Sequence, residues 1–64
     1  MKSLTNSELV RKFKEAKDFD STLIFSALIC ERAGLAKSWA RAVDAGAPAD
    51  FDSVMCLAIE RLTT

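Results

Sequence analysis

The chain has 64 residues, half of them hydrophobic, and its nine Lys and Arg residues balance nine Asp and Glu residues, with no His. A chain of this length allows one domain, which buries only about 60% of its unfolded surface and is marginally stable alone. Its longest apolar stretch is far short of the roughly 20 residues of a membrane span, which excludes a transmembrane protein. The N-terminus lacks the apolar region of a signal peptide, so we expect a cytoplasmic protein.

The first helix is expected to run from Asn6 to Lys17. Thr5 and Glu8 have the spacing of a capping box, in which each side chain accepts a hydrogen bond from the backbone N–H of the other residue. Leu4 and Leu9 have the spacing of a hydrophobic staple, which fixes the angle at which the chain enters a helix. The apolar residues at helical spacing, which should face the core, are Leu9, Val10, Phe13 and Ala16.

Charge is unevenly distributed along the chain. Residues 1–17 hold five basic and two acidic residues, whereas residues 18–64 hold four basic and seven acidic residues. The basic side of the first helix is either a solvated face or a surface that contacts an acidic partner, phosphate or a neighbouring copy. The candidate partner-binding residues on this side are Arg11, Lys12 and Lys14.

The tetrapeptide Asp-Phe-Asp-Ser occurs twice, at residues 18–21 and 50–53. Aspartates near a helix start accept hydrogen bonds from unpaired backbone N–H groups and suit the positive end of the helix dipole. Both copies therefore predict helix starts. The alternative is a pair of metal ligands or an acid–base pair, but no His, calcium-loop glycine or third carboxylate accompanies either copy.

The second helix, expected from Asp20 to Ala33, is the most apolar part of the chain. Seven of the ten residues 21–30 are apolar, and no charge appears until Glu31. A helix that is hydrophobic on all sides must be covered on all sides. Because about three other short helices are available, we expect a second copy of the chain or another protein to supply part of the cover. Gly34 suits the left-handed position that ends such a helix.

Two further helices are expected. The third, from Leu35 to Ala45, has apolar residues on one side and polar ones on the other, and residues 46–48, Gly-Ala-Pro, end it. The fourth runs from Ala49 to Leu62, with Pro48 suited to its first turn. Its apolar residues at helical spacing are Phe51, Val54, Met55, Ala58 and Leu62.

The sequence contains few of the residue types that carry out catalysis. Cys30 and Cys56 lie in apolar patterns and are interpreted as buried reduced thiols, a disulfide between them being the alternative. The chain has no His or Tyr to act as a catalytic acid or base, and its two isolated glycines do not form a phosphate-binding loop. We therefore expect a non-enzymatic protein with no catalytic residue, no cofactor and no metal site.

Residues 26–43 resemble a helix-turn-helix unit, with a small residue, Cys30, inside the first helix and Gly34 at the turn four residues later. Residues 47–49 and 56–63 resemble the tail of Cro-like phage repressors, with residues 51–55 as an insertion. The resemblance implies DNA binding through a recognition helix in the major groove, with Lys37, Ser38, Trp39 and Arg41 on it. The alternative is an αα-hairpin with Trp39 in the core or an interface, which the neutral net charge favours because DNA-binding domains are basic.

The whole chain resembles a small early protein of lambdoid phages, encoded between the exonuclease and excisionase genes. Residues 4–13 and 38–48 carry this similarity. The resemblance implies an accessory protein of phage development in the bacterial host cytoplasm, which influences host replication or the choice between lysis and lysogeny. It assigns no catalytic or binding residue.

We predict an all-α fold, a small bundle of three to four short helices over residues 1–64, with the second helix central. The expected partners are a second copy and an unidentified host or phage protein, with DNA as the less favoured partner and no membrane. The residues assigned to the core or to the oligomer or partner interface are Phe25, Leu28, Ile29 and Trp39.

Overall fold

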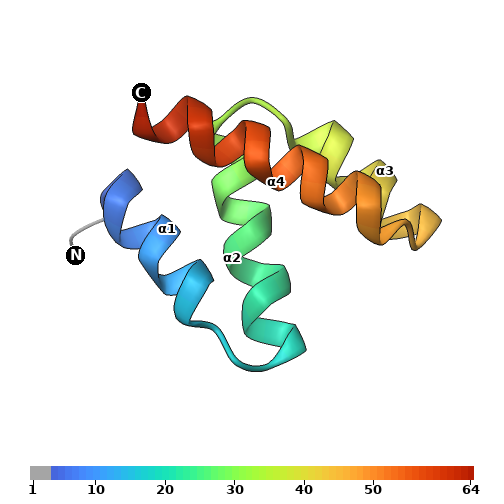
Figure 1. Ribbon diagram of the computed structural model, residues 1–64, viewed down its shortest axis with the longest axis horizontal. Coiled ribbons are helices and arrows are strands. Elements are labelled where there is room, and N and C mark those ends of the chain that lie inside the picture. Colours follow the sequence, from blue (N-terminus) through green and yellow to red (C-terminus); the bar gives the residue numbers. More distant parts are fainter. Residues whose placement is uncertain (1–3) are drawn as a thin grey trace.

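The computed structural model describes residues 4–64, and these residues form four α-helices and no strand (Figure 1). The helices are α1 (Asn6–Glu15), α2 (Phe19–Arg32), α3 (Ala36–Ala45) and α4 (Pro48–Thr63). The predicted all-α bundle is confirmed. α1 lies beside α2. α3 and α4 run side by side in opposite directions across the C-terminal end of α2. α2 contacts each of the other three helices, as predicted for a central helix, and α4 does so as well.

Side-chain caps define two of the helix starts. Thr5 Oγ1 accepts a hydrogen bond from the Glu8 backbone N–H at 3.1 Å, and the Thr5 N–H donates to Glu8 Oε1 at 3.2 Å, which confirms the capping box. Asp18 accepts from the Ser21 N–H at 3.0 Å and caps α2, as the first Asp-Phe-Asp-Ser copy predicts. The second copy lies inside α4, which begins at Pro48, so Asp50 occupies the first turn without capping it.

Glycines end α2 and α3. Gly34 has a φ of +76°, and the next residue, Leu35, donates its N–H to the Cys30 carbonyl at 2.7 Å. Gly46 has a φ of +60° and plays the same part at the end of α3. Only glycine adopts this left-handed conformation at little cost, so these two residues fix the directions in which α3 and α4 leave.

The core lies where α1, α2 and α4 meet. Its buried residues are Leu9, Val10, Ile29, Cys30, Met55 and Ala58. The Cys30 thiol lies 3.5 Å from the Met55 sulfur, and burial raises the pKa of this thiol, so it packs as a small apolar group. Trp39 of α3 is half-buried against this cluster, and Ala42 of the same helix is also buried.

The prediction that both cysteines are buried is wrong for Cys56, which is exposed. The buried stripe of α4 passes through Met55 and Ala58. Cys56 follows Met55 by one residue, or about 100° around the helix, and so leaves the stripe. Both thiols are free.

Within residues 4–64, no helix combines the length and the hydropathy needed to cross a bilayer.

Asp18 should make the stability of the fold depend on pH in acid. Hydrogen bonds from Ser21 lower the pKa of this carboxyl from its ordinary value of 3.8. The stabilisation is therefore complete above the ordinary pKa and is lost as the pH falls through the lowered pKa of the folded state. Asp18→Asn keeps a capping side chain but removes the titration. In urea unfolding between neutral pH and about pH 2, the midpoint should fall less steeply for the variant; equal slopes would contradict the assignment.

Candidate interaction surfaces

The outer face of α2 carries large apolar side chains that no other helix covers. Ile24 is 59% exposed and Leu28 is 41% exposed. The two lie one helical turn apart, on the side of α2 opposite the fully buried Ser26 and Ile29. Ile24 and Leu28 together are called the α2 outer face below. The remaining helices thus leave an apolar strip of α2 in contact with solvent.

The structure does not bring the four residues of the predicted core or interface set onto one surface. Ile29 has no exposed surface and belongs to the core. Phe25 and Trp39 are half-buried against the core, and Leu28 alone is exposed. Ile24 was missed, although its spacing of four residues from Leu28 is a sequence signal that places both side chains on the same face.

A hydrogen bond joins Trp39 of α3 to Ser26 of α2. Its indole N–H donates to Ser26 Oγ at 2.8 Å, and this hydroxyl donates in turn to the Leu23 carbonyl at 2.7 Å. The buried serine is therefore satisfied as both donor and acceptor. Trp39 is half-buried against the core and does not stand out from α3 as an exposed reader of bases.

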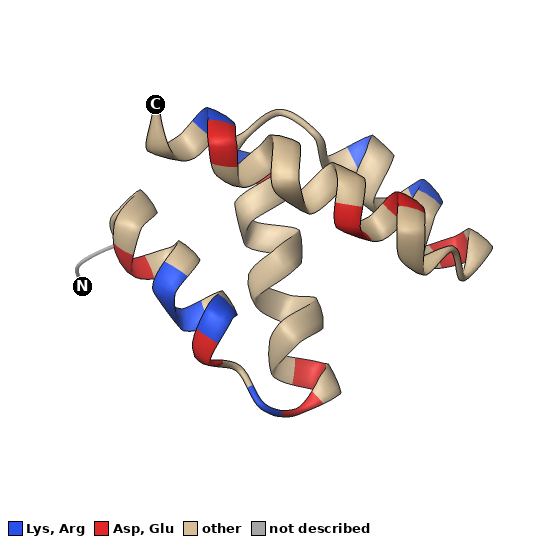
Figure 2. Cartoon of the chain, viewed as in Figure 1, with Lys and Arg blue, Asp and Glu red and all other residues tan. Residues whose placement is uncertain are grey.

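The candidate basic face of α1 is exposed but is not uniformly positive. Arg11, Lys12 and Lys14 are all exposed, and Figure 2 shows that the blue part of α1 lies between two red segments. The red segments are Glu8 and Glu15. The pKa of Glu8 is lowered, first by its hydrogen bonds with Thr5 and then by the positive charges of Arg11 and Lys12. Helical spacing places Arg11 and Lys14 on one side of the two glutamates and Lys12 on the other.

The candidate recognition residues on α3 are exposed together. Lys37, Ser38 and Arg41 all face solvent. Ser38 and Arg41 line a shallow hollow of about 440 Å³ between α3 and α4, where Asp50 lies on the other wall. The exposed Asp44 also shares the outer side of α3 with Lys37 and Arg41. Arg41 therefore has one carboxylate on the next turn of α3, Asp44, and another across the hollow on α4, Asp50.

No group of three or more potential metal ligands occurs among the His, Cys, Asp and Glu residues of the described part of the chain. The exposed Cys56 and the buried Cys30 have no basic residue beside them in sequence that would activate a thiol. The surfaces described above offer shape and charge for binding another molecule.

Comparisons with protein-family models, with curated proteins and with solved structures found no match to this chain.

Proposed function

We propose that this chain is a non-enzymatic accessory protein that acts by binding other proteins and that assembles with a second copy through the α2 outer face. The observation that carries the proposal is the exposure of Ile24 and Leu28 on the most apolar helix of the chain. Large aliphatic side chains gain about 1.5–3 kcal/mol each when they are fully buried. A partner that covers this strip removes the exposed apolar surface of Ile24 and Leu28 from water, and this burial favours association.

A second copy fits this strip by symmetry. Most homo-oligomers are two-fold symmetric dimers, in which the same patch of both chains meets. In an antiparallel pair of α2 helices, Ile24 of each copy lies near Leu28 of the other.

The exposed cations of α1 are the proposed contact with a further partner. Arg11 and Lys14 lie on one side of the helix, away from the core, and suit an acidic surface. The similarity of residues 4–13 and 38–48 to a small early protein of lambdoid phages supports a role in the bacterial host cytoplasm. There the chain would bind a host or phage protein and alter host replication or the choice between lysis and lysogeny.

Expression in a bacterial host of lambdoid phages tests this role. We expect the native chain to change the rate of host DNA synthesis or the fraction of infected cells that become lysogens. A triple variant, Arg11→Gln, Lys12→Gln and Lys14→Gln, should lose the effect, because glutamine keeps the helix but removes the positive charges. Lys17→Gln, an exposed change beyond the end of α1, is the matched control. A triple variant as active as the native chain would contradict the proposed role of α1.

A helix-turn-helix DNA-binding regulator is the second candidate function. It is favoured by one observation: Lys37, Ser38 and Arg41 are exposed together on the helix that follows the glycine turn. It predicts binding to duplex DNA that weakens steeply as salt rises, because phosphate contacts release counterions. Arg41→Ala should weaken this binding. Titration of the chain with duplex DNA at low salt tests it, and no binding there would exclude this function.

A further inference from the structure

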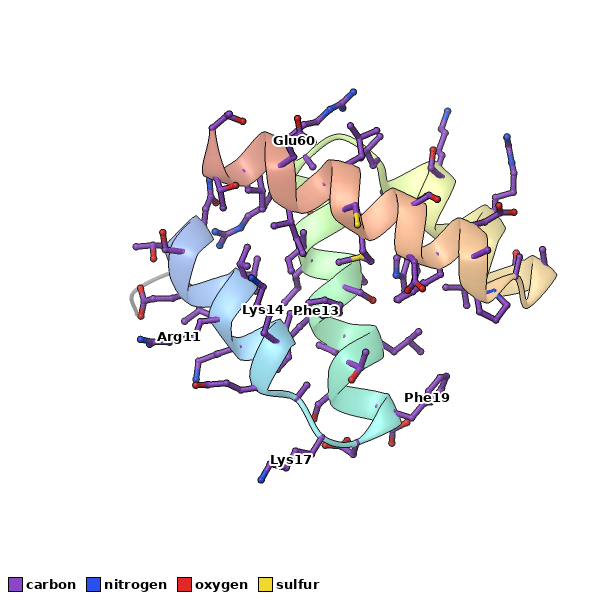
Figure 3. The ribbon with its side chains drawn as sticks, viewed as in Figure 1. Arg11, Phe13, Lys14, Lys17, Phe19 and Glu60 are labelled. Atoms are coloured by element: carbon purple, nitrogen blue, oxygen red, sulfur yellow. The ribbon has the colours of Figure 1, made fainter. Side chains whose placement is uncertain are left out.

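A groove opens where the start of α2, the end of α3 and the start of α4 meet. Its volume is about 310 Å³, and its apolar walls include Leu23, Val43 and Phe51. Phe19, the first residue of α2, stands at the lip of this groove and is 75% exposed, the largest exposure among the big apolar side chains of the described residues. It points away from α1 (Figure 3). The groove lies at the end of the molecule where α3 and α4 connect, and the α2 outer face does not line it.

The rim of the groove is acidic. Asp52 lines the groove itself, and Asp18 and Asp20 flank Phe19 in the sequence. Figure 2, in which Asp and Glu are red, shows red segments at the start of α2 and at the connected ends of α3 and α4. Asp52 is the one charged residue among those that line the groove, and no Lys or Arg lines it.

The negative charge of these aspartates limits which molecules can bind in the groove. A second copy docked groove to groove would bring the aspartates of both chains together, and like charges across an interface oppose binding. The basic helix α1 of a second copy would match the charge, but its Leu9 and Val10 are buried in its own core and offer nothing to fill an apolar groove. The occupant that fits both the apolar walls and Asp52 is a different protein whose apolar side chains are flanked by positive charges.

We propose that this groove binds a short amphipathic helix of another protein whose apolar stripe is bordered by Lys or Arg residues. The apolar side chains of such a helix enter between α2 and α4 and cover Phe19. Its cations then lie near Asp52 and the aspartates that flank Phe19. This is the helix-in-groove mode of recognition, in which apolar anchors recur at helical spacing. Neither self-association through α2 nor the cations of α1 are needed for it.

Two synthetic helical peptides test the proposal. Both carry the same leucines at positions i, i+3, i+4 and i+7; one has lysines and the other has glutamates at the flanking positions. Titration into the isotopically labelled chain should show that the lysine peptide binds and shifts the backbone amide signals of Thr22, Val43 and Ala47, which line the groove. Its affinity should fall as salt screens the charges. Equal binding of both peptides, or signal shifts confined to α1, would overturn the proposal.

Variants of exposed groove residues complete the test. Phe19→Ala should weaken binding of the lysine peptide about tenfold, because large aromatic anchors dominate such contacts. Asp52→Asn should weaken it less and should reduce its salt dependence. Leu57→Ala removes an apolar side chain that is 44% exposed elsewhere on α4, and it should leave the affinity unchanged. Native affinity in both groove variants, or an equal loss in the Leu57 control, would refute the assignment.

Discussion

Replacing Ile29 by Ala is expected to destabilise the fold by about 2–5 kcal/mol, the range for truncating a fully buried aliphatic side chain. Ile29 has no exposed surface and lies in the central helix, where it packs in the core with residues of α1 and α4. The lost side chain removes both apolar burial and contacts that the surrounding helices cannot restore by collapsing. A domain of this length has a small reserve of stability. Thermal unfolding followed by circular dichroism should show a melting temperature at least about 10 °C below the native one.

Leu57→Ala is the matched control for this prediction. It removes a side chain of similar size from a position that is 44% exposed on α4. Surface substitutions of this kind usually change stability by no more than about 0.5 kcal/mol. If Ile29→Ala and Leu57→Ala lowered the melting temperature equally, the placement of Ile29 in the core would be wrong.

The double variant Ile24→Lys and Leu28→Lys is expected to abolish self-association while leaving the helices intact. Both side chains are exposed in the single chain, so the substitutions create no cavity in the core. At a two-fold interface each copy contributes both residues, and the variant therefore places four ammonium groups against one another in a partly desolvated contact. The dissociation constant should rise at least about a hundredfold, which corresponds to about 3 kcal/mol.

Sedimentation velocity checks this second prediction, with circular dichroism as the measure of folding. Leu57→Lys adds a positive charge at an exposed apolar position away from the α2 outer face, and it should leave the dissociation constant close to the native value. A folded double variant that associates as tightly as the native chain would show that α2 is not the contact.

Local sequence signals predicted the helix boundaries well, because their physical causes are local. The hydrogen bonds between Thr5 and Glu8 depend only on residues three positions apart, and Gly34 has a left-handed conformation that the turn itself requires. The apolar stripe of α4 fixes which of its sides faces the core. The same periodicity explains why Cys56 is exposed, because it lies about 100° around the helix from Met55 in that stripe, although its neighbours in the sequence are apolar.

The candidate surfaces were harder to predict because they depend on how distant segments pack. The α2 sequence is apolar on all sides, so it does not distinguish Ile29, which the other helices bury, from Ile24, which they leave exposed. The groove combines the first turn of α2 with the connection between α3 and α4, and no single segment carries its shape. Trp39 is oriented toward α2 by its hydrogen bond to Ser26. The two residues are 13 positions apart, and sequence spacing does not reveal such a contact.

The mass of the native chain in solution tests the central claim most directly. Light scattering after gel filtration, at low and at physiological salt and over a range of concentrations, measures it without any substitution. The account predicts a dimer or larger assembly that dissociates on dilution and persists at physiological salt, because apolar burial between the α2 outer faces holds it together. A well-folded monomer at every concentration would contradict it and would mean that α2 tolerates the exposure of Ile24 and Leu28 without a partner copy.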